Sequence, residues 1–163
     1  MSDAIDVWQA FWSSSATISA ILFGAVLIVV SVLAKEGTSP QKVPSKSQAF
    51  GVLLAYATVT LIGLLVLMPM FSPRRLGAVV AFVGAILVVG TSWQMISARS
   101  VNSLIVFHWI RLAPWLCYVI VLWSGLKIMR GGVHSINWLA IGCLLLLVTG
   151  GASSIDLLRR FSD

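Results

Sequence analysis

Charged side chains are scarce in this sequence. Of its 163 residues, 11 are Lys or Arg and five are Asp or Glu, which makes 10% charged, whereas a water-soluble domain has about a quarter. Apolar residues make up 59%. This composition excludes an ordinary soluble domain, and several apolar runs of about twenty residues predict an integral membrane protein. Building the spans uses the whole chain, so we expect one transmembrane domain over residues 1–163.

Side chains for acid–base, metal or redox chemistry are equally rare. Four of the five acids lie outside the confident apolar spans, which leaves little for general acid–base catalysis. No HExxH motif, P-loop, Ser-His-Asp set or pair of intramembrane carboxylates is visible. Cys117 and Cys143 lie in apolar spans and form no CxxC, so we read them as small hydrophobic residues. We therefore expect no enzyme, no cofactor and no metal site.

A basic surface for nucleic acid is also missing. The net charge is +6, but the basic residues stand singly or in pairs at span ends, as in membrane anchoring. No basic stripe with interleaved aromatic residues occurs, so the expected partner is the lipid bilayer and not a nucleic acid. Most of the seven tryptophans fall near span ends, and Trp8 and Trp12 suit the membrane interface. This pattern predicts an aromatic belt.

Five apolar segments predict an all-α fold, a polytopic transmembrane helical bundle. A short helix over residues 3–13 is expected before the first span. Because the N-terminus has no positively charged region of the kind found in signal peptides, we expect the first span to be retained. The spans are predicted at residues 14–34, 49–70, 76–96, 104–128 and 135–158.

Two places leave the helix boundaries open. The fourth span is either one helix over residues 104–128, or an interfacial helix over 101–112 followed by a short span over 113–129. We favour a kinked or broken helix at Pro114, since proline is well tolerated at a first helical position. The small residues 150–154 either continue the fifth span or begin a short amphipathic helix.

Small and hydroxyl-bearing residues recur on the first and third spans. Small residues spaced by four allow close helix contacts in lipid, within or between protomers, and we expect self-association. Ser15 and Ser19 either line a hydrated path or link helices by hydrogen bonds, and we favour the second interpretation. The small residues are Ala16, Ala20 and Gly24 on the first span and Gly77, Ala81 and Ala85 on the third.

Arg111 is the strongest functional signal, because it is a charge inside an apolar segment. An arginine at the bilayer centre costs about 2.5–3.5 kcal/mol on insertion scales. It therefore either extends to the membrane surface or lines a cavity as a fixed charge. Asp156 is its natural partner, in competition with Arg160 four residues further on. His108, one turn before Arg111, either relays protons or is hydrogen-bonded and inert.

The distribution of Lys and Arg indicates an orientation. With the N-terminus outside, six basic residues fall on the inner side and four on the outer side, which favours a cytoplasmic C-terminus. The inner set is Lys35, Lys42, Lys46, Arg99, Arg159 and Arg160, and the outer set is Arg74, Arg75, Lys127 and Arg130.

The first half of the chain carries a family resemblance. The stretch SSATISAILFGAVLIVVSV over Ser14 to Val32, a polar loop and then LLVLMPMFSPRR resemble the start of a loose group of small bacterial integral membrane proteins. The resemblance implies a bacterial inner membrane location and no site residue. From the residues themselves we predict a homo-oligomeric channel or permeation protein, with Arg111 and His108 lining or gating the path. The alternative is a non-catalytic accessory, assembly or regulatory subunit of a larger membrane complex.

Overall fold

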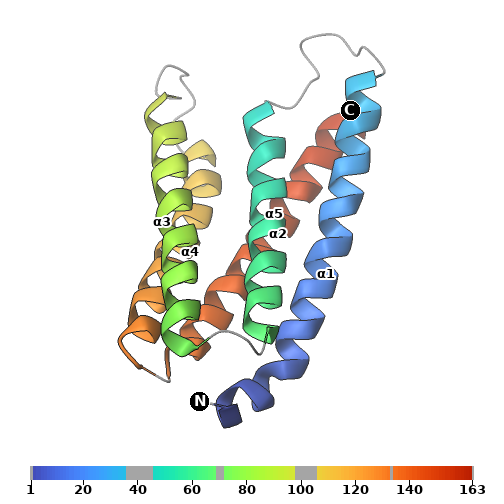
Figure 1. Ribbon diagram of the computed structural model, residues 1–163. Helices are drawn as coiled ribbons and strands as arrows, with labels where there is room; N and C mark the ends of the chain where they lie inside the picture. The colour runs from blue at the N-terminus through green and yellow to red at the C-terminus, as the bar shows by residue number, and fades with distance from the viewer. Residues whose placement is uncertain (1, 36–45, 69–71, 98–105, 133, 163) are drawn as a thin grey trace.

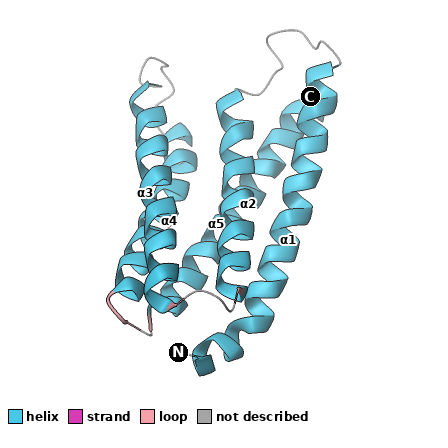
Figure 2. Ribbon diagram, in the orientation of Figure 1, coloured by secondary structure: helices cyan, strands magenta, loops and turns pink. Residues whose placement is uncertain are grey.

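The computed structural model describes residues 2–35, 46–68, 72–97, 106–132 and 134–162, with side chains described over 8–31, 50–68, 72–93, 112–132 and 134–155. All regular structure in these ranges is α-helical (Figure 2). Each helix is long and apolar enough to cross a membrane, so the all-α transmembrane class is confirmed. The helices are α1 (Ser2–Lys35), α2 (Lys46–Leu67), α3 (Pro73–Ser97), α4 (Val106–Met129) and α5 (Ser135–Ser162).

The helices form two antiparallel pairs joined by α5 (Figure 1). α1 packs along α2, and α3 packs along α4. α5 contacts both pairs through α2 and α4, whereas α2 and α3 touch little although they follow each other in the chain. Since successive helices run in opposite directions, the two ends of the chain lie at opposite ends of the bundle.

Two predicted boundaries disappear in the structure. The short helix expected over residues 3–13 and the first span are one helix of 34 residues. The serine run between them does not end the helix, because the Ser15 hydroxyl donates back to the Trp12 carbonyl at 3.1 Å. α5 likewise runs without interruption through residues 150–154. The expected separate amphipathic helix at the C-terminus is therefore the last part of α5.

α4 is continuous through Pro114, so the structure shows the unbroken alternative for the fourth span. Proline is tolerated inside transmembrane helices because neighbouring groups and small local adjustments satisfy the carbonyl that it frees. A separate helix ending before Pro114 is not formed. Residues 101–105 of the predicted interfacial helix lie outside the described ranges.

The start of α3 lies earlier than the sequence pattern indicated. The helix begins at Pro73, and the Ser72 carbonyl accepts the first backbone bond from Leu76 at 3.0 Å. Proline suits a first helical position because its missing N–H would have no partner there. Arg74 and Arg75 consequently lie in the first turn of α3 and not in a loop before it.

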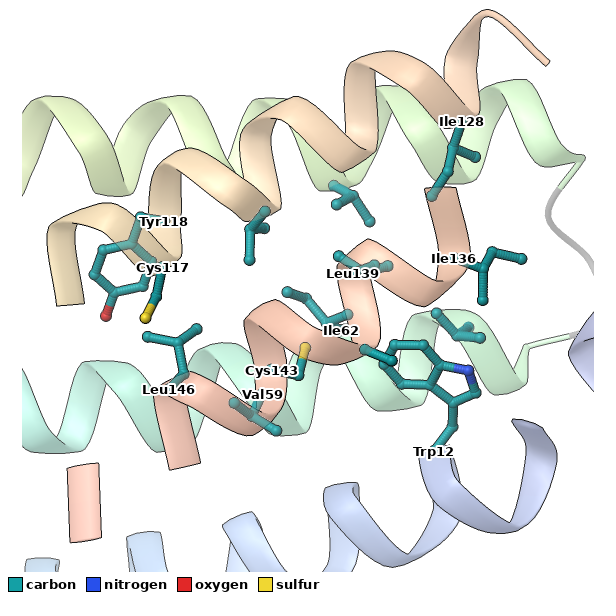
Figure 3. Packing of buried hydrophobic residues seen from close by; sticks show 14 of the residues in the cluster. Trp12, Val59, Ile62, Cys117, Tyr118, Ile128, Ile136, Leu139, Cys143 and Leu146 are labelled. Atoms are coloured by element: carbon teal, nitrogen blue, oxygen red, sulfur yellow. The ribbon is translucent and has the colours of Figure 1, made fainter. Parts of the chain in front are cut away.

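All five helices contribute side chains to one apolar core (Figure 3). Fully buried members include Trp12 of α1, Ile62 of α2, Val80 of α3, Tyr118 of α4 and Leu139 of α5. Because lipid tails are as apolar as the helices, the hydrophobic effect contributes little to helix association, which rests on close packing and hydrogen bonds. The contacts between helices therefore decide which parts of this bundle are rigid.

Candidate functional site

The closest helix contact lies between α3 and α4. A Cβ added to Gly125 would stand 2.5 Å from the Ala81 backbone nitrogen, and one added to Gly84 would stand 2.8 Å from the Leu122 Cα. A Cβ on Gly77 would collide with the Met129 backbone nitrogen. Real Cβ atoms do not come this close to backbone, so only glycine fits at these positions.

The predicted small-residue face of α3 therefore lies in part at this contact. Gly77 and Ala81 are buried against α4, whereas Ala85 is only half-buried. The helix turns so that Gly84, and not Ala85, meets the α4 backbone. A spacing of four drifts around a helix of 3.6 residues per turn, so the third member of such a series leaves the contact.

The contact between α1 and α2 has one close point. A Cβ on Gly63 would stand 2.8 Å from the Ala16 Cβ and 3.2 Å from the Trp12 carbonyl oxygen. The other small residues predicted on this face do not pack within the bundle. Ala20 is exposed, and a Cβ on Gly24 would meet nothing within 4 Å. The closest approach of α1 to α2 therefore lies in its first half, while Leu22, Phe23 and Val26 of its second half pack partly buried around Val52 and Tyr56.

A hydroxyl pair joins the same two helices. The Ser19 and Thr60 hydroxyl oxygens lie 2.8 Å apart, and either group can donate. Ser19 is fully buried and also lies 2.7 Å from the Ser15 carbonyl. Ser19 thus links α1 to α2 by a hydrogen bond, whereas Ser15 bonds to the Trp12 carbonyl of its own helix and links no helices.

A second polar link joins α2 to α5. The hydroxyl oxygens of Tyr56 and Ser154 lie 3.2 Å apart. The Tyr56 ring packs on Gly150, where an added Cβ would stand 3.1 Å from the ring carbon Cε1. Tyr56 also belongs to a small buried cluster with Val52, to which Leu22 of α1 adds its side chain. Gly150 of α5 therefore makes room for the Tyr56 ring.

Trp12 departs from the prediction of an interfacial aromatic residue. It is 0% exposed and lies in the core, with the Phe11 ring edge-to-face at 5.0 Å (Figure 3). The reason is that Trp12 lies at the close contact of α1 with α2, where a Cβ on Gly63 would stand 3.2 Å from the Trp12 carbonyl oxygen. Its indole Nε1 is the one buried side-chain nitrogen or oxygen without a hydrogen-bond partner in the described part of the chain.

Other tryptophans are exposed, as a membrane belt requires. Trp93, Trp123 and Trp138 each have more than half of their side-chain surface uncovered. Trp115 instead lies between helices, where its Nε1 donates to the Ser92 hydroxyl at 3.0 Å. This bond joins α3 and α4 at the end opposite to Gly77.

The predicted ionisable site falls at the edge of what is described. The backbone places His108 and Arg111 in α4 and Asp156 in α5. Their side chains lie outside the described ranges, so the pairing of Arg111 with Asp156 stays a prediction. His134, in the turn before α5, is exposed.

The described side chains offer little reactive chemistry. Cys117 and Cys143 are free and buried in the apolar core. Within the described ranges, no three His, Cys, Asp or Glu side chains gather as a metal site would require. The buried hydroxyls of Thr58 and Ser124 donate to carbonyls one turn earlier in their own helices, at 2.7 Å in each case. These groups serve packing and helix stability.

Sequence reasoning missed the residues that make the closest contacts. Gly63, Gly84 and Gly125 were not singled out, and neither was Thr60 as the partner of Ser19. Each of these glycines stands inside an apolar span, where glycine weakens a helix. This position could have indicated that close packing requires glycine there. What the sequence does not give is the partner across the contact.

Comparisons with known proteins identify no relative. No family model, no curated protein and no solved structure matches this chain. The observations above therefore stand alone: a five-span helical membrane protein with an apolar, closely packed interior.

Proposed function

We propose that this chain is a non-catalytic accessory or assembly subunit of a larger membrane complex. The observation that carries the proposal is the exposure of α1. Only 17% of the residues in the α1 span Trp8–Ser31 are buried, compared with 33–44% in the other four spans. α1 stands at the edge of the bundle, packed along α2 and in minor contact with α5 (Figure 1).

The open face of α1 has the spacing of a helix-packing seam. Ile18, Ile21, Ala25 and Ile28 are all exposed, and their separations of three, four and three residues place them on one side of the helix. We define these four residues as the α1 seam. Both lipid and a partner helix can cover such a face, so the partner must be tested directly.

The interior supports a role without catalysis. The buried hydroxyls Ser15, Ser19, Thr58 and Ser124 all donate to backbone carbonyls of their own helices, and not to a side chain that could act as a general base. The largest side chains of the core are apolar or aromatic. A protein that has stable packing and an open helix face is suited to assembly.

A homo-oligomeric pore is the alternative. It would need a water-facing surface between copies, with Arg111 and His108 at the path. The exposed side chains along the described spans are instead large and apolar, as at Phe82, Ile86 and Val148. The test is ion transport in proteoliposomes. Loss of transport in Arg111→Ala, together with a reversed ion preference in Arg111→Glu, would favour the pore over the accessory role.

Location and orientation complete the proposal. The resemblance of the first half of the chain to small bacterial membrane proteins supports a bacterial inner membrane. The excess of basic residues supports a cytoplasmic C-terminus with the N-terminus outside. The odd number of spans agrees with ends on opposite sides of the membrane.

The test combines affinity purification with a matched pair of variants. The tagged full chain is purified from native membranes in mild detergent, and the recovered assembly is weighed by native mass spectrometry. We expect one partner protein to be recovered with this chain in a fixed ratio. The Ile21→Trp/Ile28→Trp variant of the α1 seam should no longer recover that partner. The control Ile86→Trp/Ile155→Trp changes two isoleucines on α3 and α5 that are also more than half exposed, and this variant should retain the partner.

Three outcomes would contradict the proposal. A closed multimer of this chain alone would favour the pore. Equal loss of the partner in both variants would show that the seam is not the contact. A monomer from native membranes, with no partner in fixed ratio, would remove the accessory role.

A further inference from the structure

Two basic pairs, distant in sequence, lie at the same end of the bundle. Arg74 and Arg75 are in the first turn of α3, while Lys127 is in the last turn of α4 and Arg130 follows that helix. All four are exposed. We call these four residues the basic end of the α3–α4 pair.

The glycine contact fixes the two pairs beside each other. Gly77 meets the backbone of Gly125 and Met129, so the two helix backbones touch at this level. The arginines precede Gly77 by two and three residues, and the basic residues of α4 stand within two residues of Met129. With a rise of 1.5 Å per residue, each lies within about 4.5 Å of the contact along the helix axis. The long side chains therefore surround one end of the helix pair.

The α4 end is held by a well-defined cap. Gly132 N donates to the Lys127 carbonyl and Gly131 N donates to the Ile128 carbonyl, both at 3.0 Å. Gly131 has a φ of 87°, the left-handed conformation that this cap requires. Arg130 is thereby fixed directly at the end of the helix and not in an extended loop.

Exposed tryptophans place this end at the membrane surface. The Lys127 Nζ lies 5.4 Å from the centroid of the exposed Trp123 ring, one turn further into the span. Trp138, in the first turn of α5, is also exposed at this end of the bundle. Because exposed tryptophans prefer the headgroup level, the basic end lies beside lipid phosphates.

The charge here has one sign among the described side chains. No Asp or Glu occurs in the ranges whose side chains are described. α1 begins at the same end of the bundle with Asp3 and Asp6, but it packs on α2 and α5 and not along the α3–α4 pair (Figure 1). In the proposed orientation this end faces the outer leaflet, and an exposed group of four cations at headgroup depth there matches the phosphates of anionic lipids.

We infer that the basic end binds the headgroup phosphates of anionic phospholipids. Arginine and lysine form charge-assisted hydrogen bonds with phosphate oxygens, and cations at the same level of two touching helices present several donors to the surrounding headgroups. The inference concerns a lipid site and does not depend on the proposed role as a subunit.

The test is native mass spectrometry of the full chain in mild detergent. Phosphatidylglycerol and phosphatidylcholine with identical acyl chains are offered in equal amounts. We expect the original chain to bind phosphatidylglycerol in preference to phosphatidylcholine. Phosphatidylglycerol should bind about tenfold more weakly to R74Q/R75Q and to K127Q/R130Q than to the original chain. High salt should also weaken its binding. R74K/R75K keeps the charge and should retain binding, and R159Q/R160Q removes two charges near the other end of α5 and should change it little.

Several results would overturn the inference. Equal binding of the two lipids would show that the basic end does not select anionic headgroups. An equal loss in R159Q/R160Q would show an effect of net charge and not of this place. Displacement of the lipid by millimolar inorganic phosphate would indicate a site for soluble anions, and displacement by an acidic peptide would indicate a protein partner. The four side chains are exposed, so the variants should keep the helix content of the original chain by circular dichroism.

Discussion

The two helix pairs of this protein are joined in different ways. In α3–α4, Gly77, Gly84 and Gly125 bring backbone against backbone at several levels, and Trp115 adds a hydrogen bond to Ser92. In α1–α2, one close point at Gly63 and one hydroxyl pair join the first half of α1 to α2, and the second half packs on α2 through partly buried side chains around Tyr56. The comparison teaches that α3–α4 is a rigid unit, whereas α1 keeps a long face available for another molecule.

α5 makes this division possible. It places Ile136, Leu139, Ala140, Cys143 and Leu146 in the core, more buried residues than α1 contributes. α1 adds Trp12 alone to the same cluster of buried residues. Trp12 is therefore the main side chain by which α1 enters the core, with Trp8 and Phe11 packed partly buried beside it, and its contribution can be tested by substitution.

Trp12→Ala should have the largest effect on stability. It removes the main core side chain of α1, and we expect a loss of about 3 kcal/mol. That is the lower end of the range for buried tryptophan, because lipid and not water covers the group when helices separate. The measurement is unfolding in mixed micelles. Trp93→Ala, at a site 72% exposed, is the control and should change stability by less than about 0.5 kcal/mol.

Trp12→Phe sharpens the same test. Since the indole Nε1 has no hydrogen-bond partner, phenylalanine loses ring volume but no bond. We expect it to retain most of the stability that Trp12→Ala loses. A loss as large as that of the alanine variant would contradict the observed environment of the indole.

Gly125→Ala should disturb the other pair by a smaller amount. The added Cβ would stand 2.5 Å from the Ala81 nitrogen. Normal contacts need about 3.5 Å, so α3 and α4 must separate by roughly 1 Å. Overpacking of this kind typically costs 1–3 kcal/mol, and we expect about 2 kcal/mol in the same unfolding assay.

The matched control is Gly90→Ala on α3. No atom lies within 4 Å of a Cβ at that position, and alanine favours the helix, so stability should be unchanged or slightly higher. Equal stability of Gly125→Ala and Gly90→Ala would contradict the close backbone contact between α3 and α4. If both were equally destabilised, glycine at these positions would be needed for a reason other than packing.

The fold was largely predictable because apolar length is a direct signal. The number of spans and the helical class follow from runs that match the bilayer thickness. The helix ends were harder. The sequence pattern placed the start of the first span at Ser14, yet α1 begins at Ser2 since serine hydroxyls bond to their own helix and allow it to continue. Pro114 is likewise accommodated within α4.

The contacts were predicted only in part, since they depend on how helices rotate against each other. Gly77, Ala81 and Ala16 lie at helix contacts, but Ala20 and Gly24 of the same spacing face outward. A stripe of small residues marks a face that permits close approach and does not say which helix approaches it. The four cations of the basic end could be assigned to one side of the membrane from the order of the spans, whereas the close contact of α3 and α4 beside them depends on the same rotation.

Ser19→Ala should have the smallest effect of the three substitutions. It removes the hydroxyl that lies 2.8 Å from Thr60 Oγ1, and hydrogen bonds between membrane helices average about 0.6 kcal/mol. The measurement is a double-mutant cycle with Thr60→Ala, which isolates the coupling between the two hydroxyls. Thr17→Ala is the control, because its exposed hydroxyl bonds only to the Ser13 carbonyl of its own helix. A coupling near zero would place the α1–α2 attachment on Trp12 and Gly63 alone and would sharpen the contrast with α3–α4.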